Sequence, residues 1–403
     1  MQIYLDYSAT TPPRPEAIAA MQTAMMQQWG NASSLHEWGN RAATMLERSR
    51  LQVASLINAA TAESIIFTAG GSEANNLAIF GVANQVEAQA NQVHRSHRQA
   101  APFHLIISAV EHSAISEPAR QLQARGWQIT QLPVNAQGAV DPQQLRAALQ
   151  PNTALVSIIY GQSEVGTLQP IVELGAIVQA HGARFHTDAV QVAGRLPIDV
   201  QQLPVDLLSL SSHKIYGPQG AGALYIRPGV ALPSAIVFGG GQEQGLRSGT
   251  QAIPSVVGFG VAAELAAIEM PTETLRLIQL RDRLFALLAD TPELLPTGDL
   301  RHRLPHHVSF CLPSTDITGK ALVRQMNLAG IGISAGSACH SGQLNPSPIL
   351  QAMGYGDRTA KTGIRLPLGK HTTAADIDWS ALALKQILAR TSAHRLPCLE
   401  GAV

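Results

Sequence analysis

A lysine lies in a polar run that directly follows an apolar segment. The run Ser211–Pro218 (SSHKIYGP) comes after Leu207–Leu210, which predicts a buried strand. A lysine at the carboxyl end of such a strand can lose solvation, lower its pKa and act as an amine nucleophile. A lysine in a surface turn is the alternative, and the run alone does not separate the two. We therefore take Lys214 as a candidate catalytic residue.

A carboxylate closes another predicted strand, upstream of the lysine. Asp188 ends the segment Arg184–Asp188, and the chain from there to Lys214 is long enough for one crossover to a neighbouring strand. Enzymes that bind pyridoxal phosphate (PLP) through a lysine pair the pyridine nitrogen with an acidic side chain, which keeps the ring protonated as an electron sink. An aspartate that caps the next turn is the alternative. Together, the two residues indicate a PLP site.

A glycine-rich turn precedes a predicted helix and could bind an anion. The run Ala69–Asn76 (AGGSEANN) follows the predicted strand Ser64–Thr68. Free amide groups at a helix start and the helix dipole both favour a phosphate there, next to Gly71 and Ser72. The run has neither the lysine of a P-loop nor the spacing of a dinucleotide motif, so it does not indicate a nucleotide. A simple helix cap by Ser72 is the alternative.

Two more residues could take part in the chemistry. His112 follows the predicted strand Phe103–Ser108, where an imidazole can lie over a cofactor ring or act as an acid or base. Cys339 lies among small residues in SAGSACHSG, which indicates an exposed, mobile nucleophile. Cys311, by contrast, has apolar neighbours and is expected to be buried, and Cys398 is expected to be a bystander in a polar tail. A structural histidine is the alternative for His112.

Composition limits the classes of function. The 403 residues include 28 basic and 28 acidic side chains, so the net charge is zero, and only 14% of the residues are charged. This balance leaves no basic surface for nucleic acid or anionic lipid, so we expect neither as a partner, and we expect no metal site. Three cysteines without a CxxC spacing, and no signal peptide, favour a reducing, cytoplasmic compartment.

The elements that must position these residues alternate along the chain. The predicted strands are Ser64–Thr68, Phe103–Ser108, Trp127–Leu132, Ala154–Tyr160, Arg184–Asp188, Leu207–Leu210 and Gly222–Ile226. Between them lie the predicted helices Glu73–Asn84, Ser113–Arg125, Pro142–Leu149 and Ile171–His181. This alternation favours an α/β domain with a mostly parallel seven-stranded sheet flanked by helices. Ligands bind at the carboxyl ends of the strands of such sheets, where Asp188 and Lys214 lie.

The pattern changes after Thr250 and predicts a smaller α+β domain. It comprises helices Pro254–Met270, Thr272–Ala289, Thr318–Leu328 and Ala374–Arg390 and strands His307–Leu312 and Gly363–Leu368. We expect a large domain over residues 15–257 and a small one over residues 258–403, which carries the cysteine loop and includes the N-terminal arm 1–14. Residues 92–102 are expected to form a solvated surface loop.

The chemical motifs occur together with several others in a specific order. These are YLDYSATTP at Tyr4–Pro12, GNASSLH at Gly30–His36, GGGQEQGLRSGT at Gly239–Thr250, and Gly363–Arg365. Taken over nearly the whole chain, the series resembles the cysteine desulfurases of the NifS/IscS type, within the class V aminotransferases. The resemblance implies the fold of a fold-type I PLP-dependent transferase.

The resemblance also implies a role for each motif residue. Lys214 would bind PLP covalently, Asp188 would pair with the ring nitrogen, Gln191 with the ring hydroxyl, and His112 would stack on the ring. The phosphate would be held by Gly71, Ser72, Ser211 and His213, joined by Thr250 from the other subunit of a homodimer. Arg365 would bind the substrate carboxylate. Two positions depart from the family: Ser163 replaces an asparagine next to the substrate and cofactor, and His340 follows the cysteine where a small hydroxyl residue is commoner.

The implied activity is the conversion of L-cysteine to L-alanine, with the sulfur retained on Cys339 as a persulfide. The persulfide would then supply an acceptor protein, such as a scaffold for iron–sulfur cluster assembly. A PLP-dependent carbon–sulfur lyase, selenocysteine lyase or aminotransferase on the same fold is the alternative, although it leaves Cys339 without a role. A protein without catalytic activity that relays sulfur or acts as a scaffold is a third hypothesis, and it would need no PLP.

Overall fold

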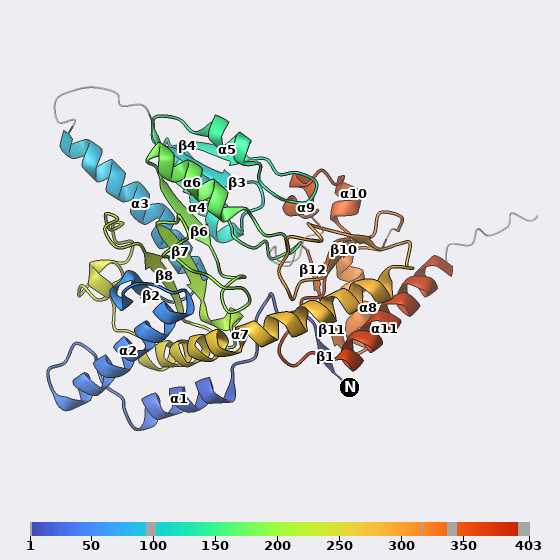
Figure 1. Cartoon of the computed structure of the whole chain (residues 1–403), viewed down its shortest axis with the longest axis horizontal. Coiled ribbons are helices and arrows are strands. Elements are labelled where there is room, and N and C mark those ends of the chain that lie inside the picture. Colours follow the sequence, from blue (N-terminus) through green and yellow to red (C-terminus); the bar gives the residue numbers. More distant parts are fainter. Residues whose placement is uncertain (1, 94–101, 316, 337–344, 394–403) are drawn as a thin grey trace, which may run out of the picture.

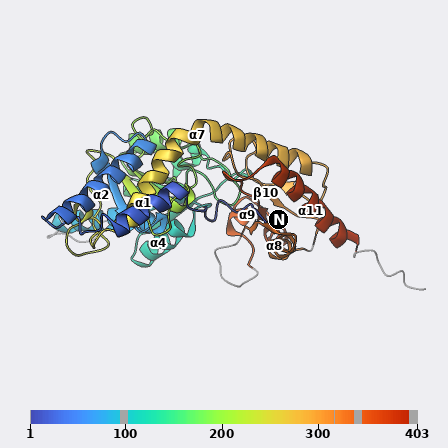
Figure 2. The ribbon, with the colours of Figure 1, turned by 90° about the horizontal axis from the view of Figure 1, so that it is seen from below.

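The computed structural model describes residues 2–93, 102–315, 317–336 and 345–393. Two bodies lie side by side, and the long helix α7 (Ile253–Leu288) runs through both (Figures 1 and 2). The larger body contains the central sheet, and the smaller one contains the C-terminal elements. Most of the predicted loop 92–102 falls outside the described residues.

The larger body is built on a seven-stranded sheet. In spatial order its strands are β2 (Ile65–Thr68), β8 (Gly222–Ile226), β7 (Leu207–Ser211), β6 (Arg184–Asp188), β5 (Thr153–Ser157), β3 (His104–Ser108) and β4 (Gln128–Leu132). The strands from β7 to β4 pair in parallel, and β8 runs antiparallel to both of its neighbours. The prediction of a mostly parallel seven-stranded sheet is confirmed, with strand ends shifted by a few residues at most.

Helices cover both faces of this sheet because each face carries its own set of apolar side chains. On β2, for example, Phe67 belongs to one core and Ile66 to the other. The first core also takes residues from α2 (Glu37–Leu56), α5 (Pro142–Ala148) and α6 (Ile171–His181). The second takes residues from α3 (Gly71–Val93) and α4 (Ser113–Ala124). Helix α1 (Pro15–Met26) packs on α7 at the outside of the larger body, and α2 packs on α7 as well (Figure 1).

The smaller body has a core of its own around a four-stranded antiparallel sheet. Its strands, in spatial order, are β12 (Ser334–Ala335), β13 (Ile364–Arg365), β10 (Ser309–Cys311) and β9 (Leu295–Pro296). Its helices are α8 (Gly319–Leu328), α9 (Pro348–Ala352), α10 (Asp357–Ala360) and α11 (Ala374–Ala393). The N-terminal strand β1 (Ile3–Tyr4) pairs in parallel with β11 (Ile331–Gly332), so the start of the chain lies against the C-terminal elements.

Helix α7 corrects one prediction. The sequence predicts two helices that break at Pro271, but a single helix continues through this residue. Proline removes one backbone hydrogen bond and usually ends a helix. Here the residues up to Ala266 pack in the core of the larger body, and those from Leu277 onward pack in the core of the smaller one. Packing on both sides of Pro271 therefore outweighs the lost hydrogen bond.

The course of α7 also bears on the domain boundary and on membranes. The expected boundary between residues 257 and 258 lies inside α7, and the division into residues 15–257 and 258–403 stays a prediction. By length and composition α7 could also cross a membrane, but the core helix of a soluble protein passes the same test.

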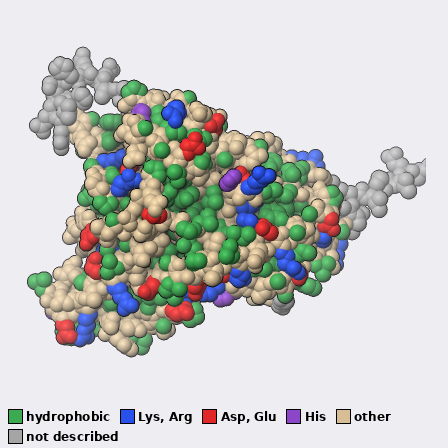
Figure 3. Space-filling view, in the orientation of Figure 1, with side chains coloured by type: hydrophobic (Ala, Val, Ile, Leu, Met, Phe, Trp, Pro, Cys, Tyr) green, Lys and Arg blue, Asp and Glu red, His purple; other side chains and the backbone are tan. Residues whose placement is uncertain are grey.

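On the face shown in Figure 3, basic and acidic side chains are interspersed, in keeping with the zero net charge.

Candidate active site

A cavity of about 720 Å³ lies at the carboxyl ends of the parallel strands. Its walls come from the segments that follow β2, β3, β5, β6 and β7, from the N-terminal arm and from β13. The expected site residues that line it are Gly71, Ser72, His112, Ser163, Asp188, Gln191, Ser211, His213, Lys214 and Arg365. The fold therefore brings ten candidates from distant parts of the sequence into one place.

Lys214 ends a short 3₁₀ turn, Ser212–Lys214, directly after β7. Its Nζ donates hydrogen bonds to the backbone oxygens of Ser8 at 2.7 Å and Ala9 at 2.6 Å. Burial lowers the pKa of Lys214 to about 8, and the positive charges of Arg365 and Arg195 act in the same direction. A lysine in this state can hold or release a proton near neutral pH. The structure thus favours the interpretation of Lys214 as a nucleophile over that of a lysine in a surface turn.

Asp188 is buried at the end of β6 and is held by two donors. The Nδ2 of Asn75, from the first turns of α3, donates to its Oδ2 at 2.7 Å. The backbone amide of Val190 donates to its Oδ1 at 3.0 Å. These bonds fix the orientation of the carboxylate. An oriented, buried carboxylate in this cavity suits the protonated nitrogen of a pyridine ring.

The start of α3 and the end of β7 form a small anion cradle. A Cβ at Gly71 would lie 2.9 Å from Val190 Cγ2 and 3.3 Å from Ser211 Cβ, so this turn has room only for glycine. Among the described residues, the buried Ser211 Oγ has no hydrogen-bond partner. An unsatisfied donor next to the first residue of α3 matches a phosphate. Burial, and then the charge of Lys214, lowers the pKa of His213 to about 4, so a neutral ring lines the cavity.

Gln191 and His112 approach the cavity from two sides. Gln191 donates from Nε2 to the backbone oxygen of Ser8 at 2.9 Å, whereas its buried Oε1 accepts no hydrogen bond from the described residues. His112 caps α4, and its Nδ1 accepts from the amide of Ala114 at 3.1 Å. In the neutral imidazole the proton then resides on Nε2, so that this atom is the donor. Both side chains therefore have fixed orientations.

Arg365 belongs to β13 and reaches the cavity from the smaller body. Its Nη1 donates to the backbone oxygen of Ser163 at 3.1 Å, and its Nη2 lies 3.5 Å from Asp6 Oδ1 and 3.4 Å from Ser334 Oγ. Burial raises the pKa of Asp6 in spite of this guanidinium. The buried Nε of Arg365 has no acceptor within the part of the chain that the structure describes. The guanidinium can therefore take a further carboxylate.

One expected residue does not join this group. Thr250 is exposed and does not line the cavity. Its segment is anchored on the same chain, because Glu243 binds Arg50 at 2.7 and 2.9 Å and accepts from the amide of Phe67 at 2.8 Å. Cys339, with His340 and Cys398, lies outside the described residues. Cys311 is buried, as predicted, and burial raises the pKa of its thiol to about 12.

Three further residues were missed by the sequence reasoning. Ser8 supplies a backbone oxygen to both Lys214 and Gln191, and Asn75 orients Asp188. Glu111 is fully buried beside His112, accepts hydrogen bonds from Ser108 Oγ and the amide of Ile159, and has its pKa raised to about 8 by burial. Ser8 and Asn75 occur in runs that the sequence singles out, and Glu111 directly precedes the candidate His112, but no local pattern indicates their partners.

Comparison with known proteins places the chain in a defined group. The family described as aminotransferase class-V matches residues 3–379. The chain is 40% identical to a cysteine desulfurase IscS from Dictyoglomus turgidum over 388 residues, which cover 96% of this chain and 94% of that protein. The structure of a NifS-like protein matches with a TM-score of 0.86 at 30% identity, covering 97% and 100% of the two chains. The structure titled "SspA in complex with cysteine" matches with a TM-score of 0.79 at 31% identity, covering 93% and 100%. These matches confirm the predicted fold class and the resemblance drawn from the motifs.

Proposed function

The chain belongs to the class-V aminotransferase family, whose members depend on PLP, and from this premise we propose that it is a cysteine desulfurase. It would convert L-cysteine to L-alanine and retain the sulfur on Cys339 as a persulfide. The single observation that carries this proposal is the meeting of Lys214, Asp188 and Arg365 in one cavity. Relatives named cysteine desulfurase match nearly the full length of the chain.

The residues of the cavity fit PLP. Ser211 Oγ and Gln191 Oε1 are buried polar atoms without partners in the described chain, and the glycine at position 71 leaves space where a side chain would clash. Gly71, Ser72, Ser211 and His213 would bind the phosphate, Gln191 the ring hydroxyl and Asp188 the ring nitrogen, with His112 over the ring. PLP held in this position would withdraw electrons from the substrate carbon next to the amine.

The side chains around this group supply binding and proton transfer. Arg365 would bind the substrate carboxylate with its planar fork, and Ser163, whose carbonyl already binds Arg365, would line the substrate position. Lys214 Nζ would take the proton from the α-carbon, a task that its lowered pKa of about 8 favours. The amide of Asn75 would hold Asp188 in line with the ring nitrogen.

Sulfur transfer is assigned to Cys339 from its motif. Its Sγ would form a bond with the substrate sulfur while the bond from that sulfur to the β-carbon breaks, so that alanine leaves and a persulfide remains. The strand β12 that precedes this segment pairs with β13, with Ser334 opposite Arg365. The chain therefore enters the cysteine segment beside the proposed carboxylate-binding residue.

A direct assay tests the proposed function. The purified, PLP-loaded protein is incubated with L-cysteine, the products are quantified, and Cys339 is examined by mass spectrometry. We expect alanine and a persulfide on Cys339, and we expect Cys339→Ser to keep PLP but to lose sulfur transfer. Pyruvate and ammonia in place of alanine would identify a carbon–sulfur lyase, and undiminished alanine formation by Cys339→Ser would remove the role of this cysteine. The same assay with selenocysteine as the substrate tests the alternative that the protein is a selenocysteine lyase.

We also propose a homodimer in which Thr250 completes the phosphate site of the other subunit. The exposure of Thr250, outside the cavity of its own chain, supports this arrangement. Lys214→Ala chains are mixed with Thr250→Glu chains, whose added charge would repel the phosphate. If Thr250 acts across the interface, one site in each mixed dimer is intact and activity returns. If it acts within its own chain, the mixture stays inactive.

The remaining assignments concern the cell. We propose that the persulfide is passed to an acceptor protein, such as an iron–sulfur scaffold, and that the enzyme is cytoplasmic. The low number of cysteines and the names of the relatives support this setting. Transfer of labelled sulfur from the loaded enzyme to a purified scaffold protein tests the first assignment, and fractionation of the source cells tests the second.

A further inference from the structure

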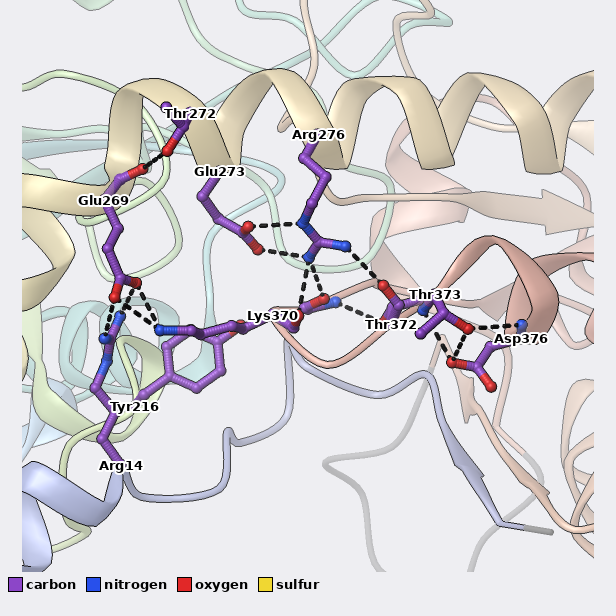
Figure 4. A network of polar contacts seen from close by, with 11 residues as sticks. Arg14, Tyr216, Glu269, Thr272, Glu273, Arg276, Lys370, Thr372, Thr373 and Asp376 are labelled. Atoms are coloured by element: carbon purple, nitrogen blue, oxygen red, sulfur yellow. Dashed lines mark hydrogen bonds and ion pairs between the residues drawn. The ribbon is translucent and has the colours of Figure 1, made fainter.

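A polar network joins three parts of the chain next to the active site (Figure 4). Glu269, in the middle of α7, accepts hydrogen bonds from Arg14 Nη1 at 2.8 Å and Nη2 at 2.7 Å. The same carboxylate binds Lys370 Nζ at 2.7 and 2.8 Å. The hydrogen bonds from Arg14 are the main cause that lowers the pKa of Glu269 to about 2. One carboxylate thus holds two cations from opposite ends of the sequence throughout the neutral pH range.

On the side of the larger body, the network reaches the lysine segment. Arg14 precedes α1, and its backbone amide donates to the oxygen of Tyr216 at 2.9 Å, while its guanidinium lies 5.5 Å from the centre of the Tyr216 ring. Tyr216 comes two residues after Lys214, and its amide donates to Thr11 Oγ1 at 2.7 Å. Tyr216 has a φ of +67°, a conformation that is costly for a non-glycine residue and that these contacts maintain.

On the side of the smaller body, the network holds the segment that follows Arg365. The amide of Lys370 donates to Tyr216 Oη at 2.7 Å, so the two segments also touch directly. Arg276, further along α7, donates to the backbone oxygens of Gly369 at 2.9 Å, Lys370 at 3.1 Å and Thr372 at 2.7 Å. The chain from Arg365 to this segment is short, so a shift of the segment would shift the guanidinium of Arg365.

We propose that Glu269 is a positioning residue that sets Arg365 of the smaller body relative to Lys214 of the larger one. The inference rests on the proposed function and deepens it. An amino-acid substrate carries its amine and its carboxylate on one carbon, so Lys214 and Arg365 must be correctly spaced to engage both groups at once. A small displacement of one body against the other weakens the carboxylate contact and leaves the amine contact unchanged.

The substitution Glu269→Gln tests this role, because it keeps the shape of the side chain and removes its charge. The matched control is Asp378→Asn on α11, which breaks the ion pair of Asp378 with Arg283 at 2.6 and 2.8 Å. Arg283 also belongs to α7, but this pair joins two helices of the smaller body. A second variant, Lys370→Gln, removes one of the two cations and keeps the pair between Arg14 and Glu269.

Binding of two small ligands to the PLP-loaded proteins is followed by the change in absorbance. L-alanine carries a carboxylate, and ethylamine is the same molecule without it. For Glu269→Gln and Lys370→Gln we expect the Kd of L-alanine to rise roughly tenfold and the Kd of ethylamine to change less than about twofold. Asp378→Asn should match the unsubstituted protein for both ligands. An unchanged Kd of L-alanine, an equal rise for both ligands, or loss of PLP would overturn the inference.

Failure of the proposed function would be recognised separately. It would appear in the unsubstituted protein, as absence of PLP binding or of any response to amino acids. In that case amide hydrogen exchange still tests whether Glu269 holds the segment that follows Arg365. Faster exchange of the amides of Leu368 and Lys370 in Glu269→Gln, but not in Asp378→Asn, would support its positioning role. Equal exchange in the two variants would overturn it.

Discussion

Acidification should destabilise this protein in a way that can be traced to His186. This residue is fully buried in β6, two residues before Asp188. Its Nδ1 is hydrogen-bonded to Ser157 Oγ on β5 at 2.8 Å, and its Nε2 to Ser209 Oγ on β7 at 2.9 Å. A neutral imidazole donates with one nitrogen and accepts with the other, so it satisfies both serines in the centre of the sheet.

The pKa of His186 gives the size of the effect. Burial lowers it from 6.5 to about 3. Because the folded-state pKa lies below the unfolded one, the unfolded chain binds the proton first, and the stability is fully present above pH 6.5 and lost as the pH falls towards 3. Each unit of pKa difference corresponds to about 1.4 kcal/mol in the free energy of unfolding. His186 therefore contributes about 5 kcal/mol in total, of which about 2 kcal/mol is lost between pH 7 and pH 5.

The variant His186→Phe isolates this contribution. It leaves two buried serine hydroxyls unpaired, at a cost of about 1–3 kcal/mol each that does not depend on pH. Urea unfolding of both proteins is followed by circular dichroism at saturating PLP, and the free energies of unfolding are compared at each pH. Other buried histidines, such as His306 and His307, are present in both proteins and cancel in the difference. At pH 7 the free energy of unfolding should be lower for the variant than for the unsubstituted protein, and this difference should shrink by about 2 kcal/mol at pH 5. A difference that does not change with pH would refute the reasoning.

Three further substitutions test the site. Lys214→Ala should give a folded protein without detectable alanine formation, since the amine proposed to bind PLP and to take the α-proton is missing. Alanine release from the purified variant would contradict this prediction. Asp188→Asn should keep PLP with a shifted absorbance spectrum and lower the rate by several orders of magnitude, because the ring nitrogen would lose its proposed partner. Near-normal turnover would mean that another group protonates the ring. Gly71→Ala should weaken PLP binding roughly tenfold, or about 1.4 kcal/mol, because the new Cβ would lie 2.9 Å from Val190 Cγ2. If titration with PLP gives the same curve for the variant and the unsubstituted protein, the turn adapts to the added methyl group.

The layout of the larger body follows from local sequence patterns. Short apolar runs alternate with amphipathic helical segments, and this pattern depends only on neighbours along the chain. It predicts all seven strands of the central sheet, and it predicts that chemistry gathers where they end. For that reason Asp188, His112 and Lys214 could be selected before any contact was known, and the cavity contains all three. The order of the motifs then indicated the family.

The polar partners of these residues depend on the tertiary structure. Lys214 binds the carbonyl oxygens of Ser8 and Ala9, and Asp188 binds Asn75, more than a hundred residues away along the chain. A carbonyl oxygen is present at every residue, so no sequence pattern marks the few that a lysine will choose. Such contacts arise when separate elements pack together, and they fix the orientation of the two side chains.

The sequence by itself determined which residues are available for chemistry, because side-chain type and strand position are local properties. The tertiary structure decided how the two bodies meet. Pro271 predicts a break, yet α7 continues because each half is packed in a different core. The pairing of Arg14 and Lys370 on Glu269 has no signature along the chain, since it unites residues from both ends. Long-range packing, which outweighs the local cost of one proline, sets the distance between Lys214 of the larger body and Arg365 of the smaller one.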